Sequence, residues 1–447
     1  MGIPATPIIT QRFQGLIAKY TYKMGTPNMR IVYVPHPIAN RPTTICNQYI
    51  NGKDPITGKP ILDELVSALT KPLSDEDKKS GFLARAPRPR MLEPNTAANL
   101  EQMFHDNNWT DGLPIVLPTE QKVAEMLRAT SHKSDELVGT MRASSPHEGW
   151  EYNVEMVAVN AVMAGARPEY FPVILAIAST GATSLLSSTS SAARMVVVNG
   201  PIREQIRMNS GIGSVGPFSQ ANSTIGRAWT LISKNLGGSG SPGDTYMGTL
   251  GNNLNYNNIC FAEAEDQLPS GWNPVHVQKG FKPGDSAIST FNGWSVAQMS
   301  SYYALPPQEV IRQWLTHFLS TGSGSATLLL DPLLAKDLSD QGFETKEKLC
   351  EWLAINAKTP AWLYWVNRAN ELKQAKAGIE PFASYLKLGE EANIPVSSYL
   401  RKSPQGMPSG SGPATSIGLI VVGGGTNAYW AGSDFSYATS SSVDRWR

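Results

Sequence analysis

The segment spanning residues 195–281 constrains the fold of this chain more than any other part of the sequence. Residues 195–198 (Met-Val-Val-Val) predict a short buried strand, which the turn residues Asn199-Gly200-Pro201 end. A glycine-rich loop follows over residues 211–217, and apolar residues then recur at helical spacing between residues 225 and 232. A strand, a glycine loop and a helix in this order predict an α/β domain.

The beginning of that helix is a candidate anion site. Unpaired backbone N–H groups and the helix dipole both favour an anion at a helix N-terminus. The candidate substrate-binding residues there are Asn209, Gly211, Gly213, Asn222 and Arg227. The glycine spacing fits neither the dinucleotide fingerprint nor the P-loop. The alternative interpretation is a tight crossover that needs glycine only for its backbone conformation.

A second candidate site follows the next expected strand. Glu263, Glu265 and Asp266 come directly after the apolar residues that follow Cys260, and His276 lies shortly beyond them. Carboxylates beside an imidazole suit proton transfer or metal binding. We therefore take Glu263, Glu265, His276 and Cys260 as candidate catalytic residues, although their spacing matches no standard metal motif. In the alternative, the carboxylates are a solvated strand end and the histidine is a hydrogen-bonded loop residue.

Composition narrows the class of protein. A chain of 447 residues is long enough for two or three folding units, and a net charge of +1 with 17% charged residues disfavours a nucleic-acid partner. We find neither a run of about eighteen apolar residues nor a secretory signal, which predicts a soluble cytoplasmic protein without a membrane partner. Cys46, Cys260 and Cys350 are widely separated and form no Cys-x-x-Cys pair, so we expect no disulfide framework.

Four regions are expected along the chain. Residues 1–75 contain a helix near residues 13–17 and a strand at residues 29–34, with no element expected before them; one helix and one strand cannot form a sheet alone. A charged, proline-containing linker covers residues 76–94. Residues 95–300 form a central α/β domain with the glycine loop, and residues 301–447 form a C-terminal α/β domain. The fold class is therefore α/β with mixed, multi-layer domains.

Local signals place further elements in these regions. Thr119 predicts the N-cap of a helix, and residues 154–164 predict a buried helix ended by glycine and proline. In the last third, strands are expected at residues 327–330 and 417–422, and a proline- and glycine-rich stretch covers residues 402–413. The second strand runs into three glycines, again at the sheet edge where α/β proteins bind ligands. The sequence shows no internal repeat strong enough to use.

Several segments together resemble one family. Gly-Thr-Pro-Asn-Met-Arg-Ile-Val-Tyr-Val-Pro-His-Pro at residues 25–37 resembles the closing helix and strand of the UGSC family of (seleno)proteins, which are flavodoxin-like domains named for a Sec/Cys-Gly-Ser-Cys motif. Residues 111–114, 159–172, 199–201 and 222–227 resemble the longer region that accompanies this domain in fused members. The resemblance implies an N-terminal fragment of a flavodoxin-like domain. It also makes Asp111 a candidate substrate-binding residue, where the local sequence alone predicts a turn.

The sequence departs from the family in one respect. It contains no Cys-Gly-Ser-Cys motif, so a second subunit would have to supply the Cys or Sec. We expect an enzyme subunit of a hetero-oligomer that acts on a small polar or anionic substrate by thiol-assisted reductive cleavage or elimination at a carbon–heteroatom bond. His36, held between two prolines, is expected at the interface.

Two alternatives stay open. One is a metal-dependent hydrolase or lyase with ligands from Glu263, Glu265, His276 and Cys260. The other is a non-catalytic scaffold subunit. The sequence points to no particular cofactor.

Overall fold

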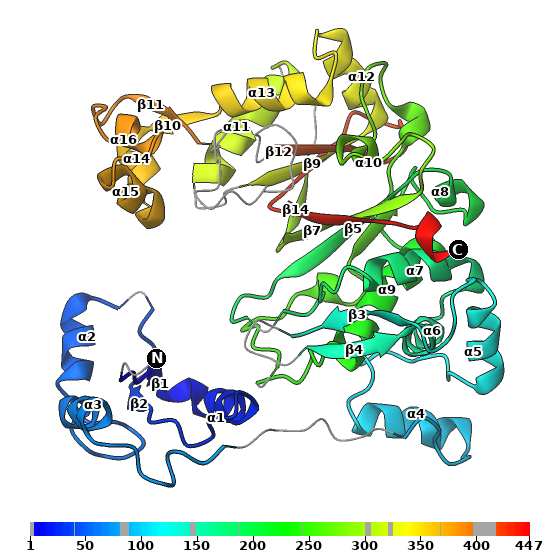
Figure 1. The fold of residues 1–447 in the computed structure, drawn as a ribbon. Coiled ribbons are helices and arrows are strands. Elements are labelled where there is room, and N and C mark those ends of the chain that lie inside the picture. Colours follow the sequence, from blue (N-terminus) through cyan, green and yellow to red (C-terminus); the bar gives the residue numbers. More distant parts are fainter. Residues whose placement is uncertain are drawn as a thin grey trace.

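The computed structural model describes residues 4–447 except residues 40, 81–88, 144–148, 187, 244, 300–304, 321–324, 367 and 397–416. It shows a large α/β body and a smaller N-terminal lobe, joined through residues 81–88 (Figure 1). The expected proline- and glycine-rich stretch at residues 402–413 and much of the expected linker lie outside the described residues. In the described part of the chain, no helix is long and apolar enough to cross a bilayer.

Two four-stranded mixed sheets form the centre of the body. Sheet I has the order β14-β7-β5-β6, and sheet II has the order β12-β9-β13-β8. The strands of sheet I are β5 (Ala193–Asn199), β6 (Ile259–Ala262), β7 (Ala287–Gly293) and β14 (Ser436–Ser442). Those of sheet II are β8 (Val296–Met299), β9 (Ala326–Leu330), β12 (Ile417–Val421) and β13 (Trp430–Ser433). The α/β fold class expected from the sequence is confirmed.

The two sheets pack face to face between two layers of helices. Alternate side chains of β5 show this arrangement, because Val196 and Val198 pack with one set of helices while Met195 and Val197 face sheet II. In β12, Leu419 faces the other helical layer and Ile420 faces sheet I. Figure 1 shows the resulting order of helices, sheet II, sheet I and helices.

The helices that cover sheet I are α5 (Glu120–Leu127), α6 (Val154–Met163), α7 (Phe171–Ala178) and α9 (Gln220–Asn235). Thr119 caps α5 as predicted, and Ser219 caps α9 by accepting a hydrogen bond from the Asn222 N–H. The helices that cover sheet II are α11 (Pro307–Ser320), α12 (Pro332–Asp340) and α13 (Lys346–Asn356). Apolar burial on both faces of both sheets makes this body a self-contained folding unit.

The two sheets share one topology. In each, a parallel pair (β5 with β6, β9 with β12) is followed by an antiparallel third strand (β7, β13) and an antiparallel fourth (β14, β8). The fourth strands are exchanged, since β8 follows β7 in the chain but joins sheet II, and β14 follows β13 but joins sheet I. Each sheet therefore takes one strand from across the expected boundary at residue 300. The repeat is topological and has no counterpart that we could see in the sequence.

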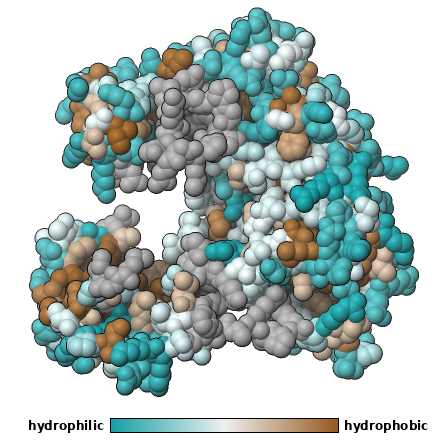
Figure 2. Space-filling model, viewed as in Figure 1, coloured by the Kyte–Doolittle hydropathy of each residue, from teal (hydrophilic) through white to brown (hydrophobic). Residues whose placement is uncertain are grey.

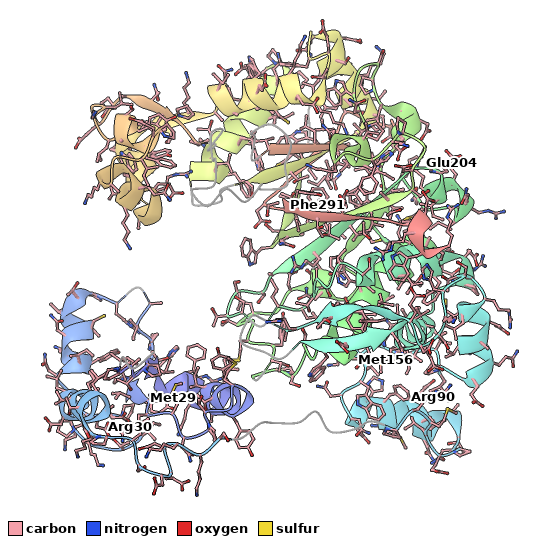
Figure 3. The ribbon with its side chains drawn as sticks, viewed as in Figure 1. Met29, Arg30, Arg90, Met156, Glu204 and Phe291 are labelled. Carbon is pink, nitrogen blue, oxygen red and sulfur yellow. The ribbon has the colours of Figure 1, made fainter. Side chains whose placement is uncertain are left out.

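Smaller elements surround this body. A hairpin of β3 (Leu137–Met141) and β4 (Trp150–Asn153) precedes α6, and α4 (Ala97–Asp106), α8 (Ile202–Gln205) and α10 (Val275–Gln278) lie around sheet I. Another small unit follows α13 and contains β10 (Lys358–Pro360), α14 (Ala361–Val366), α15 (Ala369–Lys376), α16 (Phe382–Tyr385) and β11 (Asn393–Pro395). The Arg90 guanidinium pairs with Glu155 of α6 at 2.6 Å, so the last part of the expected linker lies against the body (Figure 3).

The N-terminal lobe contains a parallel two-stranded sheet of β1 (Ile8–Thr10) and β2 (Val32–Val34). Helix α1 (Gln14–Lys23) connects the strands, and α2 (Thr43–Ile50) and α3 (Ile61–Thr70) follow. The expectation that no element precedes the first helix was wrong, because β1 precedes it and pairs with β2. Strand β1 contains only two isoleucines and a threonine, so it is too short for sequence periodicity to reveal it. The helix and strand themselves are confirmed.

Candidate functional site

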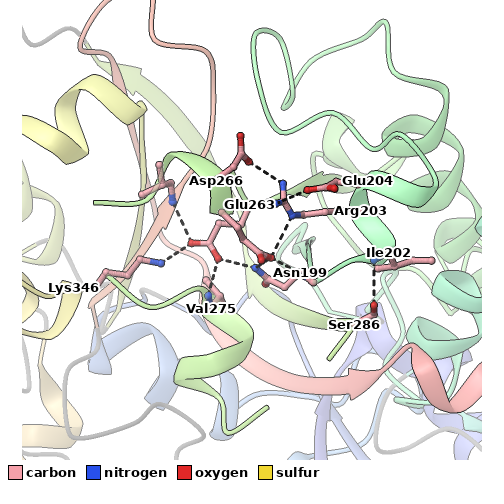
Figure 4. A network of polar contacts seen from close by, with 12 residues as sticks. Asn199, Ile202, Arg203, Glu204, Glu263, Asp266, Val275, Ser286 and Lys346 are labelled. Atoms are coloured by element: carbon pink, nitrogen blue, oxygen red, sulfur yellow. Dashed lines mark hydrogen bonds and ion pairs between the residues drawn. The ribbon is translucent and has the colours of Figure 1, made fainter. Parts of the chain in front are cut away.

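Glu263 joins four elements at the point where the two sheets meet (Figure 4). Its Oε2 accepts hydrogen bonds from Asn199 Nδ2 at 2.8 Å and from the Val275 N–H at 2.7 Å, while its Oε1 pairs with Lys346 Nζ at 2.6 Å. The N–H of Val421 in β12 lies 3.5 Å from the same Oε1. The carboxylate is fully buried and its hydrogen-bonding capacity is occupied by protein groups.

Lys346 is the partner that the sequence did not reveal. It is the first residue of α13, and its side chain is as buried as that of Glu263. A cation at a helix N-terminus opposes the helix dipole, which costs about 0.3–1 kcal/mol. The pairing with Glu263 outweighs this cost, since a charge buried without a partner costs several kcal/mol. The pair therefore fastens the helix layer of sheet II to the carboxyl end of sheet I.

Glu265 and Asp266 form a second, more accessible charged group around Arg203. Glu265 Oε1 accepts hydrogen bonds from Asn199 Nδ2 at 2.8 Å and the Gly200 N–H at 2.7 Å, and lies 3.7 Å from Arg203 Nε. Arg203 also pairs with Asp266 at 3.1 Å. The Glu265 side chain keeps 13% exposure, whereas Glu263 has none. Of the two predicted acid–base residues, Glu265 is therefore the one that solvent or a ligand can reach.

Cys260 does not join this group. Strand residues alternate between faces, so Cys260 packs with the helices over sheet I while Glu263, an odd number of positions later, faces sheet II. Its side chain lies against α9, where the position of a Cβ on Gly226 would be 3.0 Å from the Cys260 Cβ. Burial raises the pKa of the Cys260 thiol well above its ordinary value. The grouping of Cys260 with the carboxylates was therefore wrong, and strand alternation alone could have shown it.

His276 lies close to the carboxylates in the chain but makes no hydrogen bond to them. Its side chain is fully buried in the short helix α10, and neither ring nitrogen has a hydrogen-bond partner among the described residues. It is the main chain of the preceding residue, Val275, that binds Glu263. His276 was expected to orient a carboxylate or to share its proton. No hydrogen bond among the described residues supports this role.

The glycine loop is fixed by the two asparagines that we expected to bind an anion. Asn222 Nδ2 donates to the carbonyl oxygens of Asn209 and Ser214, both at 2.9 Å, and Asn222 Oδ1 accepts from the Asn209 N–H at 3.0 Å. Asn209 Oδ1 accepts from the Gly211 N–H at 2.9 Å. Gly213 has a φ of +71°, a conformation that favours glycine. These contacts fit the crossover interpretation of the loop.

Arg227 and Asp111, predicted separately as substrate-binding residues, bind each other. Arg227 Nε and Nη2 donate to the two Asp111 carboxylate oxygens at 2.8 and 2.9 Å, and Nη2 also donates to the Pro114 carbonyl at 2.8 Å. This bidentate pair ties the turn at residues 111–114 to α9. The turn interpretation of Asp111 is thus the one that the geometry fits.

The two glycine turns of the chain lie against each other. The Gly423 N–H donates to the Ser210 carbonyl at 2.9 Å, and a Cβ on Gly424 would lie only 2.2 Å from Ile212 Cγ1. Asp331, which follows β9 and caps α12, has a carboxylate oxygen 3.7 Å from the Cβ position of Gly423. Burial raises the pKa of Asp331 above its ordinary value. The carboxyl ends of both parallel strand pairs therefore meet at one edge of the body.

The sequence did not identify three residues of the network: Asn199, Arg203 and Lys346. It predicts only a turn at Asn199, although this residue ends a buried strand, where a polar side chain must find a partner. Arg203 and Lys346 lie on helices, and nothing in their local sequence separates them from solvated cations. Lys346 is distant from Glu263 in the chain, so only the tertiary structure pairs them.

Metal ligation finds no support in the described residues. No group of three or more His, Cys, Asp or Glu side chains there has an arrangement that could hold a metal ion. No family model, no curated protein and no solved structure matches this chain.

Proposed function

We propose that this chain is a subunit of a hetero-oligomeric enzyme in which a second subunit supplies the reactive thiol or selenol. The substrate would be a small polar or anionic molecule that is cleaved reductively, or by elimination, at a carbon–heteroatom bond. The proposal rests on the N-terminal lobe, whose hydrophobic core is too small for an independent domain.

The lobe buries very little apolar surface. Its core cluster contains Val32, Val34 and Ile61, with Ile50 and Leu65 packed against it. Many large apolar side chains of the lobe are exposed instead: Ile8, Tyr22, Met24, Met29, Ile38, Ile56, Leu62, Val66, Leu69 and Leu73. Figure 2 shows brown patches over this lobe. A two-stranded sheet with so small a core is at best marginally stable in water, which supports a partner that covers it.

The chain's own thiols suit catalysis poorly, which supports a thiol from the partner. Cys260 and Cys350 are buried, and Cys46 is half-buried on α2. Burial raises the pKa of Cys260, so this thiol resists forming the thiolate that attacks a substrate.

The proposed reaction uses two thiols of the partner subunit. The partner's thiolate attacks the substrate carbon, a carbon–sulfur bond forms, and the heteroatom leaves with the bonding electron pair and a proton. A second thiol of the partner then attacks that sulfur, so that a disulfide forms and the carbon leaves after taking up a proton. An external dithiol reduces the disulfide. In this scheme Glu265 donates or accepts the proton, and Glu263 holds the structure around it.

The test is to purify the tagged full-length chain from the organism that encodes it and to identify bound subunits by native mass spectrometry. We expect a stoichiometric partner whose Cys or Sec reacts with dilute iodoacetamide while Cys260 and Cys350 of this chain stay unlabelled. The purified complex is then screened for leaving-group release from small anionic substrates. Glu265→Gln should lower that rate about 100-fold, and Glu169→Gln, at an exposed site, should not. A complex without a reactive thiol would overturn the proposal.

A non-catalytic scaffold subunit is the second candidate, and the closed network around Glu263 favours it. All the predicted substrate-binding side chains, Asn209, Asn222, Arg227 and Asp111, bind groups of this chain. If this candidate is right, Glu265→Gln leaves the rate of the complex unchanged.

A further inference from the structure

We infer that the outer edge of β1 binds a parallel strand from an α/β sheet of the partner subunit. This inference rests on the proposed hetero-oligomer and adds to it the surface and the mode of binding. It follows from a difference between the two edges of the β1–β2 sheet, one of which is closed by this chain.

The edge of β2 is closed by Asp54. The Tyr33 N–H, which points away from β1, donates to Asp54 Oδ2 at 2.6 Å. Asp54 is fully buried, and its Oδ1 accepts from the Ile56 and Thr57 N–H groups at 2.7 and 3.1 Å. A carboxylate held in this way occupies the position of a neighbouring strand, so no further strand can add to β2.

The edge of β1 is open. The Pro7 carbonyl accepts a hydrogen bond from the Val32 N–H of β2 at 3.1 Å. Since the peptide unit is planar and trans, the Ile8 N–H points in the opposite direction, away from β2. Thr10 follows two residues later with the same orientation. Among the described residues β1 pairs with β2 alone, so this edge presents backbone donors and acceptors to a partner.

The occupant is a strand of a larger α/β domain rather than a second copy of this chain. Two copies related by a twofold axis would pair β1 with β1 in antiparallel orientation. That arrangement would bring a second lobe with the same small core and the same exposed residues on α3: Leu62, Val66 and Leu69. A parallel strand with its own crossover helices instead extends the parallel pair and supplies apolar cover. Purely parallel sheets require cover on both faces.

Parallel addition also determines which groups of the lobe lie at the carboxyl end of the added strand. Thr10 and His36 lie at the carboxyl ends of β1 and β2, with Thr10 Oγ1 3.1 Å from His36 Nδ1. The His36 ring packs edge-on against Phe13, with ring centroids 5.8 Å apart. Ligands of α/β sheets bind at the carboxyl ends of the strands. The carboxyl end of a strand added to β1 therefore lies beside Thr10, which contacts His36.

The test compares Ile8→Pro with Ile8→Thr in the full-length chain. Proline removes the outward N–H without touching the β1–β2 hydrogen bonds, and proline is tolerated at such edge positions. Threonine keeps the N–H and changes only the apolar side chain. Tagged variants are purified from the encoding organism, and amide exchange at Ile8 and Thr10 is measured with and without the bound subunit.

We expect the native chain and Ile8→Thr to retain a subunit with an α/β domain and to show at least tenfold slower exchange of the amides of residues 8 and 10 in the complex. Ile8→Pro should lose at least 90% of that subunit while Val32 and Val34 exchange as in the native chain. Retention of the subunit by Ile8→Pro would overturn the edge inference and leave the hetero-oligomer standing. Loss of every subunit in all three proteins would overturn both, and protection that depends on self-association would replace the partner with a second copy.

Discussion

The body and the N-terminal lobe each contain a parallel strand pair, but they cover it to very different extents. In the body, the β5–β6 pair gains two antiparallel strands, a second sheet on one face and helices on the other. In the lobe, the β1–β2 pair gains only a side-chain cap from Asp54 and a core of a few residues. Both are made of the same α/β elements. A parallel strand pair thus forms in the lobe with far fewer surrounding layers than in the body.

The comparison also separates what each region can contribute. In the body, Lys346 pairs with the buried Glu263, and Arg203 pairs with Glu265 and with the exposed Asp266. The lobe leaves apolar side chains and a strand edge uncovered. We expect the two regions to respond independently to substitutions. Every tryptophan lies at or after residue 109, so tryptophan fluorescence reports on the body and amide exchange in residues 4–80 reports on the lobe.

The largest effect is expected from Lys346→Met. The substitution leaves the buried Glu263 carboxylate without its cation and should lower the free energy of unfolding of the body by about 3–5 kcal/mol. Urea unfolding followed by tryptophan fluorescence measures the change, while exchange in the lobe should be unaltered. Lys348→Met on the same helix is the control, because Lys348 pairs with Glu344 at the surface. Equal effects of both substitutions would contradict a buried anchor at Glu263.

Asp54→Ala should act on the lobe alone. It removes the acceptor for the buried Tyr33 N–H and for the Ile56 and Thr57 N–H groups, which should cost the lobe on the order of 3 kcal/mol. We expect the Val32–Val34 amides to exchange at least tenfold faster while the tryptophan transition stays in place. The exposed Asp63 provides the control through Asp63→Ala. If the tryptophan transition moved together with lobe exchange, the two regions would not be independent.

A smaller effect is expected from Arg227→Ala. The bidentate pair with Asp111 is partly buried, and its loss should lower the stability of the body by about 1.5–3 kcal/mol. Because the pair ties residues 111–114 to α9, exchange of the Leu113 amide should rise. Arg167→Ala is matched, since Arg167 makes an exposed pair with Glu169 at 3.6 Å. Unchanged stability after Arg227→Ala would reopen a ligand-binding role for this guanidinium.

The smallest effect is expected at low pH, where the N-terminal lobe loses the contribution of the Asp77 carboxylate. The pKa of Asp77 is lowered from 3.8 to about 2, first by its hydrogen bond from Arg30 and then by hydrogen bonds from Ser74. Figure 3 labels Arg30 in the lobe. Because the folded-state pKa lies below the unfolded one, the contribution of Asp77 is present above pH 4 and is lost as the pH falls through about 2.

Asp77→Asn should therefore abolish any acid-induced rise in amide exchange around residues 72–79 over that pH range. NMR titration of the side-chain carboxyl checks the lowered pKa directly. Asp75→Asn, at a fully exposed carboxylate, should leave the acid response as it is. An Asp77 that titrates near its ordinary value would show that the contact with Arg30 is not maintained in solution.

The sequence by itself determined the local elements with strong periodicity or capping signals. The buried strand at Met195–Val198, the helix after the glycine loop, the Thr119 cap and the α/β class were all predicted and found. They were predictable because each depends on side chains only a few residues apart. Strand alternation also separates Cys260 from Glu263.

Only the tertiary structure decided the rest. The strands β7, β8, β13 and β14 were not predicted because their sequences are short or rich in small and polar residues and give weak strand signals. The repeated topology and the exchange of strands between the sheets depend on pairing between segments far apart in the chain. The same is true of the pairs Glu263–Lys346 and Asp111–Arg227, which replaced a predicted open site with internal contacts. The sequence does not show whether a charged side chain faces water or another charge. Its role depends on the dielectric and the partners that folding places around it.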